Sequence, residues 1–244
     1  MGEQVASELV AQRFPDARAA WLGGSVARGT ATSTSDLDIT VLLAGPPAPM
    51  RESLLHAGWP VELFIHTESS LTHYREKDRQ RRRPTMMRLV GESTILLDTD
   101  GSGERLQASC LAEIAAGPPA LCDTELNLLR YQVTDLLEDL LGAESNDVQT
   151  VLAAAVWQEA ARLLLSGERH WTGTGKGLLR EVEAYDALND THHAAALPAA
   201  VRAASDGKPD ALRTEVDAIL ARHGGPLFAG FQLAGTDPAE PRLR

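Results

Sequence analysis

Several features are scarce in this sequence of 244 residues, and each absence narrows the possible classes of protein. It has only two cysteines, Cys110 and Cys122, with no histidine cluster beside them, so we expect two reduced, buried thiols and neither a disulfide scaffold nor a zinc site. No apolar run approaches the ~18 residues that a membrane span needs. The segment MGEQVASELV has neither a basic nor a long apolar stretch, so we expect no secretory signal, no membrane partner and a cytoplasmic location.

Positive charge is also scarce. Lys and Arg total 23 against 34 Asp and Glu, a net charge of −11, which disfavours a broad nucleic-acid surface. One basic stretch, residues 75–88, opposes this trend. It is typical of a solvated helix face, and a patch facing phosphates is the alternative; its members are Arg75, Lys77, Arg79, Arg81, Arg82, Arg83 and Arg88.

Hydrophobic periodicity predicts an α+β chain. The first half alternates helix and strand signals: helices over 3–13 and 68–82, and strands over 18–22, 37–43, 61–65 and 94–97. After Gly117-Pro118-Pro119 the pattern is helical, with segments over 123–141, 147–165, 176–188, 193–204 and 209–222. We therefore expect an N-terminal α/β domain with a small mixed sheet over 1–116, a C-terminal helical bundle over 120–232, and a flexible tail over 233–244.

The most informative segment carries two aspartates at the start of a predicted strand. Residues i and i+2 of a strand project from the same face, so Asp36 and Asp38 point two carboxylates to one side. Like charges this close repel each other unless a cation lies between them. Mg²⁺ is the natural candidate, because it takes oxygen ligands and completes its shell with waters and substrate phosphates.

A third carboxylate, Glu62, interrupts the apolar strand predicted over 61–65. If that strand neighbours the one that carries Asp36 and Asp38, three carboxylates form a site for two Mg²⁺ ions. Two such ions can clamp the attacking and leaving oxygens of a phosphoryl displacement. The spacing permits this adjacency without proving it.

A glycine-rich turn, Gly23-Gly24-Ser25, precedes the aspartates. Glycines let a backbone approach a phosphate closely, the Ser25 hydroxyl can donate to a phosphate oxygen, and Arg28 follows one turn later. Taken alone, the same residues are more typical of a tight turn with a helix cap.

Together these elements are more specific. Gly24-Ser25, ten further residues and then Asp36-Leu37-Asp38 resemble the signature of the DNA polymerase β-like nucleotidyltransferase superfamily, and the later strand carboxylate Glu62 also fits. The resemblance implies that the Gly-Ser turn binds a nucleoside triphosphate and that the three carboxylates bind two Mg²⁺ ions. It further implies that Glu62 can act as general base toward an acceptor hydroxyl.

The order of the two halves is similar to that of the aminoglycoside nucleotidyltransferase group, as is the run Leu96–Gly101. This resemblance implies transfer of AMP from ATP to a hydroxyl of a small molecule, aminoglycoside-like acceptors included, with release of pyrophosphate. The helical domain would then close over the substrates: Lys176 is a candidate for the triphosphate, and Asp135 and Asp139 for an amine-bearing acceptor.

Other interpretations of these residues and of the whole chain are open. Lys176 can equally be an ordinary surface lysine. The acidic side chains around Asp135 and Asp139 are typical of a solvated helix face. An antitoxin-type adenylyltransferase that modifies a partner protein is one alternative function, and a non-catalytic nucleotide-binding regulator is another. Nucleic-acid polymerisation is disfavoured by the charge balance.

Overall fold

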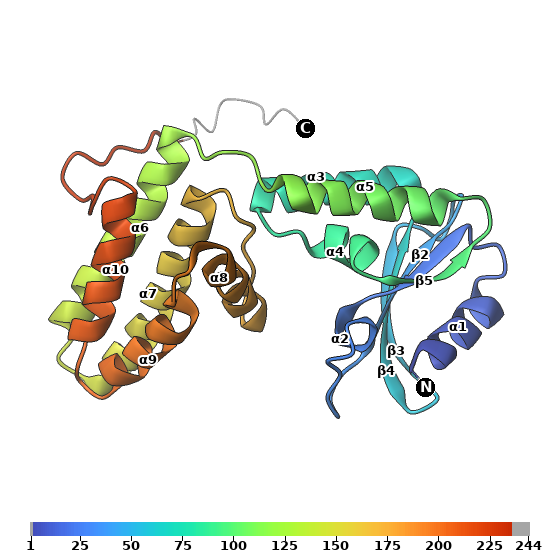
Figure 1. Cartoon of the computed structure of the whole chain (residues 1–244), viewed down its shortest axis with the longest axis horizontal. Coiled ribbons are helices and arrows are strands. Elements are labelled where there is room, and N and C mark those ends of the chain that lie inside the picture. Colours follow the sequence, from blue (N-terminus) through green and yellow to red (C-terminus); the bar gives the residue numbers. More distant parts are fainter. Residues whose placement is uncertain (1, 236–244) are drawn as a thin grey trace. The chain divides into compact units, whose positions relative to one another are not determined.

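The computed structural model describes residues 2–235, and it divides the chain into two compact units, Met1–Pro118 and Pro119–Arg244 (Figure 1). The first is mixed α/β and the second is helical, so the expected α+β class is confirmed. From residue 236 onward, the tail expected over 233–244 lies outside the described residues.

The N-terminal unit is built on a five-stranded mixed sheet with the order β3-β4-β2-β1-β5. Only β2 and β4 pair in parallel; the other neighbours are antiparallel. The strands are β1 (Ala19–Leu22), β2 (Leu37–Leu42), β3 (Met50–His56), β4 (Trp59–His66) and β5 (Thr94–Asp98).

The two faces of this sheet have different partners. Alternate residues of β2 and β4, such as Ile39 and Leu63, pack with Leu9 and Val10 of helix α1 (Gly2–Arg13) in one apolar core. The opposite face contacts α3 (Glu68–Arg81), α4 (Thr85–Gly91) and α5 (Ser102–Ala116). On that second face the Thr40 hydroxyl donates to the Leu89 carbonyl of α4.

Arginines of the basic stretch in α3 and α4 contact other side chains of the same unit. Arg75 is buried, pairs with Glu113 of α5 and donates to the Ser109 hydroxyl at 2.6 Å. Arg82, at the left-handed C-cap of α3, is buried as well. The prediction of a solvated helix face is therefore wrong for these two arginines. For Arg75 the reason is its long-range contact with α5, which the local sequence pattern does not reveal.

The C-terminal unit consists of five helices among the described residues, and their apolar faces share one core. Leu137 of α6, Leu164 of α7 and Val216 of α10 belong to that core. No helix in the described part of the chain is long and apolar enough to cross a membrane. The helices are α6 (Asp123–Gly142), α7 (Asn146–Gly167), α8 (Lys176–Asn189), α9 (His193–Ser205) and α10 (Asp210–Arg222).

Three further features differ from the sequence predictions. Strand β3 was not predicted, because it lies at the sheet edge and exposes every second residue, which weakens its apolar signal. Helix α4 was not predicted either, because seven residues are too few to show a helical period. Both cysteines are free, but only Cys110 is buried; Cys122 is exposed at the N-cap of α6, so its expected burial was wrong.

Two leucines on neighbouring strands offer a matched test of this core. Leu63 is 0% exposed and Leu55 is 79% exposed. We expect Leu63→Ala to lower the free energy of unfolding by about 2–5 kcal/mol, because it leaves a cavity between the sheet and α1. Leu55→Ala is expected to change it by less than about 0.5 kcal/mol. Urea unfolding measures both, and equal losses would contradict the assigned faces.

Candidate active site

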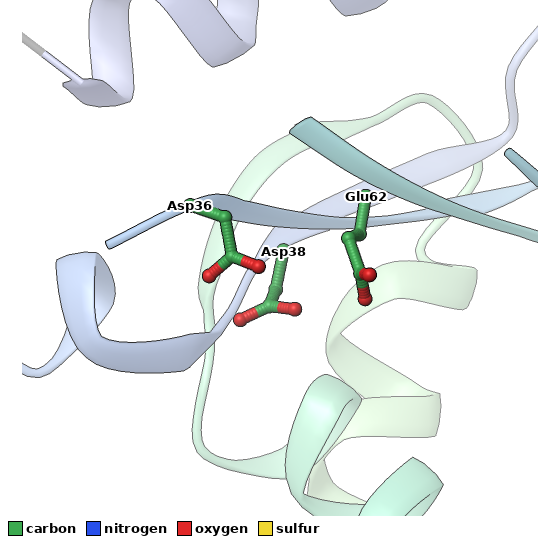
Figure 2. A group of neighbouring side chains, drawn as sticks. All are labelled: Asp36, Asp38 and Glu62. Atoms are coloured by element: carbon green, nitrogen blue, oxygen red, sulfur yellow. The ribbon is translucent and has the colours of Figure 1, made fainter. Parts of the chain in front are cut away.

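Three carboxylates meet on the face of the sheet opposite α1. Asp38 of β2 and Glu62 of β4 are direct partners in the parallel pairing, and Asp36 lies just before β2 (Figure 2). One oxygen of each carboxylate lies within 4.8 Å of the others. Among the described residues, no other group of three His, Cys, Asp or Glu side chains meets at such distances.

Strand alternation fixes this arrangement. Leu37 and Ile39 of β2, and Val61 and Leu63 of β4, are turned into the core shared with α1. The intervening residues, Asp38 and Glu62, must therefore project from the other face. Burial of the leucines thus directs the carboxylates, and a slip of one residue in either strand would reverse them.

The cluster is electrostatically strained without a cation. Burial, and after it the neighbouring Asp36 and Glu62 carboxylates, raise the pKa of Asp38 to about 6, against smaller opposing effects from Arg28 and Arg51. Three oxygen donors at this separation, one of them costly to ionise alone, are the donor set that a divalent cation such as Mg²⁺ takes. The residues present therefore fit a magnesium site.

The glycine turn lies directly against Asp38. The Gly23 N–H donates to the Asp38 carbonyl at 2.8 Å, and Gly24 has φ +69° at the start of the short helix α2 (Gly24–Ala27). A Cβ atom on Gly24 would lie 2.0 Å from Asp38 Oδ2. Only glycine satisfies both the backbone angle and this contact.

Ser25 is held by a residue that sequence reasoning missed. Its hydroxyl donates to the Ser35 Oγ at 2.8 Å, and the same Ser35 oxygen accepts the Thr32 N–H at 2.9 Å. These bonds connect the turn to the loop that leads into Asp36. Arg28, at the C-cap of α2, is exposed and near enough to lower the pKa of Asp38.

Arg51 is a second residue that sequence reasoning missed. Its Nη2 atom lies 2.8 Å from both carboxylate oxygens of Glu62. It belongs to β3, where Ser53 is paired with Glu62 and Arg51 lies two residues away on the same face. Residues 50–54 show no polar–apolar alternation, because three polar residues follow one another, and they lie beside three prolines, so the sequence offered little signal for this strand.

The other predicted site residues belong to the helical unit. Asp135 and Asp139 lie one turn apart on α6, where Asp135 is half-buried and Asp139 is exposed. Lys176 is exposed and is the first residue of α8, after Gly175 with φ +51°. The structure thus brings Gly24, Ser25, Arg28 and the three carboxylates together within one unit, whereas the roles expected of the helical residues stay predictions.

A matched glycine pair tests the contact with Asp38. Gly24 and Gly29 both have φ +69°, but nothing lies within 4 Å of a Cβ on Gly29. Both Gly→Ala variants should therefore lose about 1 kcal/mol of stability from the backbone angle. Only Gly24→Ala should also weaken Mg²⁺ binding, by about tenfold or more, because its methyl group displaces the Asp38 carboxylate. Calorimetric titration with Mg²⁺ measures the difference; equal Mg²⁺ affinities would contradict it.

The raised pKa of Asp38 predicts a pH dependence of stability in the metal-free protein. The folded state holds a proton on Asp38 up to about pH 6, whereas the unfolded chain releases it near the ordinary value of 3.8. The free energy of unfolding should therefore fall as the pH rises through this window and level off above it. Asp38→Asn should remove this component.

Urea unfolding with a chelator, from about pH 4 to about pH 7, measures this dependence as the difference between wild type and variant. The exposed Asp16 provides the control, and Asp16→Asn should keep the wild-type profile. If the stability profile of Asp38→Asn runs parallel to that of wild type, the raised pKa of Asp38 is refuted.

Comparison with known proteins agrees with this geometry. Residues 5–84 match the family model described as nucleotidyltransferase domain, and this range contains the glycine turn and all three carboxylates. None of the curated proteins compared with the sequence matches it.

Two solved structures show weaker likenesses. A nucleotidyltransferase-like protein from Exiguobacterium sibiricum 255-15 is 12% identical with a TM-score of 0.39, covering 90% of this chain and 80% of its own. A toxin-antitoxin structure with AMP-PNP is 17% identical with a TM-score of 0.29, covering 46% of this chain and 86% of its own. TM-scores this low carry no argument about function.

The identification therefore rests on the family match together with the residues that it spans. The matched range carries the Gly24-Ser25 turn and the cluster of Asp36, Asp38 and Glu62, as the resemblance in the sequence implied. Residues 5–84 thus carry a match to the nucleotidyltransferase domain family, which agrees with the superfamily that the sequence resembles.

Proposed function

We propose that this nucleotidyltransferase is Mg²⁺-dependent and transfers AMP from ATP to a hydroxyl of a small molecule, releasing pyrophosphate. The observation that carries the proposal is the three-carboxylate cluster with the Gly24 backbone against Asp38. A metal–triphosphate complex needs a site for the cation, and next to it a stretch of backbone that no side chain covers, so that the phosphates can approach closely.

Asp36, Asp38 and Glu62 would hold Mg²⁺, with two ions the expected number. Bound there, Mg²⁺ supplies charge neutralisation for the triphosphate and a lowered pKa for an attacking hydroxyl. The net charge of −11 does not oppose an anionic substrate, because the bound cation reverses the sign of the local field.

The Gly24-Ser25 turn would bind the phosphates. Gly24 exposes backbone without a side chain. The Ser25 hydroxyl can rotate away from Ser35 and donate to a phosphate oxygen instead, so that one hydrogen bond replaces another. Arg28 adds positive charge close to Asp38. Lys176 of the helical unit stays a candidate for the triphosphate on the evidence of the sequence alone.

Glu62 is the proposed general base. The acceptor oxygen would attack the α-phosphorus of ATP, its proton would pass to Glu62, and the bond to the pyrophosphate oxygen would break. Arg51 holds the Glu62 carboxylate from the β3 side through two contacts of 2.8 Å. It orients the base without itself reaching the phosphorus in this scheme.

Matched glutamate variants test the assignment. Glu62 and Glu52 both lie on strands, each is paired with one arginine, and their side chains are 27% and 32% exposed. Glu62→Gln, Asp36→Asn and Asp38→Asn should each lower transfer by about a hundredfold or more. Glu52→Gln should leave it within about twofold, because Glu52 pairs with Arg13 of α1 on the other face.

The measurement follows ATP labelled at the α-phosphate, with Mg²⁺ and a panel of hydroxyl compounds that includes aminoglycosides, and it counts pyrophosphate and labelled product. Pyrophosphate release that persists in Asp36→Asn and Asp38→Asn would refute the site. Label found only on a co-purifying protein would favour the antitoxin-type activity instead. Mg²⁺-dependent ATP binding without transfer to any acceptor would favour a regulator.

A further inference from the structure

A cavity of about 380 Å³ lies beside the acidic cluster within the N-terminal unit. It is bounded by β3, β4, α3 and α4, and Arg51 belongs both to its lining and to the cluster. Its size falls in the range of about 300–1,000 Å³ that small-molecule sites occupy. Its lining includes Arg51, Phe64, His66, Tyr74, Asp78 and Arg81.

The cavity opens on the carboxylate face of the sheet. Phe64 and His66 follow Glu62 on β4 by two and four residues, so the three side chains share one face. The sheet order β3-β4-β2-β1 places this cavity on the β3–β4 side of Asp38 and the Gly24-Ser25 turn, which follows β1, on the opposite side.

The two sides of the carboxylate cluster suit different substrates. In an in-line displacement the attacking and leaving oxygens lie on opposite sides of the phosphorus. If the turn holds the phosphates that leave, the cavity next to Glu62 is on the side from which the acceptor attacks. The position therefore favours the acceptor over the nucleotide as its occupant.

The walls of the cavity are largely apolar and aromatic. Phe64, Met86 and Leu89 line it together with Tyr74, whose ring packs edge-to-face on His66 at 5.2 Å between centroids. Burial lowers the pKa of His66 to about 4, so this imidazole is neutral at pH 7. An aromatic or aliphatic body is the kind of group that such walls accommodate.

The charges accessible to an occupant are positive. The carboxylate of Asp78 is buried, accepts the Met86 and Met87 N–H groups at 2.6 and 3.0 Å, and is paired with Arg81. The side chains of Arg81 and Arg51 are instead 57% and 62% exposed, and each uses one nitrogen for its carboxylate. Both guanidinium groups thus retain donors for an anion.

We propose that this cavity is the acceptor site and that the acceptor is a small hydroxyl compound with an apolar or aromatic body and an anionic group. Arg51 and Arg81 would then be specificity-determining residues. The inference rests on the proposed function, and it differs from the amine-bearing acceptor suggested by Asp135 and Asp139 in the sequence. A polycation would meet two guanidinium groups in this cavity and no free carboxylate beyond the catalytic cluster.

Three phenols with the same body test the charge preference: 4-hydroxyphenylacetate (anionic), its amide (neutral) and tyramine (cationic). Their dissociation constants for the full chain with Mg²⁺ are measured by NMR titration. We expect the anion to bind about tenfold more tightly than the amide, the size of one charge-assisted hydrogen bond, and tyramine to bind most weakly.

Variants locate the effect. Arg81→Gln should remove most of the preference for the anion, whereas Phe64→Leu should weaken all three ligands alike. The control is Arg105→Gln, because Arg105 is also 57% exposed and paired with one carboxylate, Glu68, but lies outside the cavity lining. Arg81→Gln leaves Asp78 bonded to two backbone N–H groups, so the variant should fold, and thermal unfolding checks this.

Equal or tighter binding of tyramine or of the aminoglycoside kanamycin would overturn the inference, as would identical effects of Arg81→Gln and Arg105→Gln. Competition between the anionic phenol and a non-hydrolysable ATP analogue would also overturn it, because the cavity would then hold the nucleotide. Mg²⁺-dependent binding of the analogue is measured in the same samples. If it persists while the phenols fail to bind, the acceptor inference falls and the proposed function stands.

Discussion

The parallel pairing of β2 with β4 is the constraint on which the site depends. It sets Asp38 directly opposite Glu62, although 23 residues separate them in sequence and β3 lies between them in the chain. The apolar residues of both strands are buried against α1, so the free energy of core formation holds two carboxylates close together on the other face. The fold, not any local attraction, supports this unfavourable contact.

That contact gives the site its chemistry. A carboxyl whose pKa is raised to about 6 by burial and by two like charges is poorly stabilised alone and gains when a cation binds. Arg51 partly compensates the cluster through Glu62, and Gly24 leaves the space that Asp38 occupies. The same arrangement of carboxylates therefore sets both the charge balance of the free protein and its affinity for a cation.

The sheet order also divides the site into sides. The Gly24-Ser25 turn, which we propose binds the phosphates, follows β1, whereas the apolar cavity with its two exposed arginines lies by β3 and β4. The carboxylates stand between them on β2 and β4. A transfer reaction needs its donor and acceptor on opposite sides of the reacting phosphorus, and the strand order provides such a separation within a single domain.

The sequence by itself determined the class of the fold, most of the helices and strands, and the motif of the candidate site, because these depend on periodicity and on short spacings such as Gly24-Ser25 to Asp36 and Asp38. It could not establish that Glu62 joins them, since strand pairing is a long-range property that the spacing only permits. The contacts of Arg51, Ser35 and the buried Arg75 could not be predicted for the same reason: their partners lie 11, 10 and 38 residues away in the chain. Arg51 also belongs to an edge strand with a weak apolar signal. Only the tertiary structure, which brings these partners together, decided the neighbours and charge of the site.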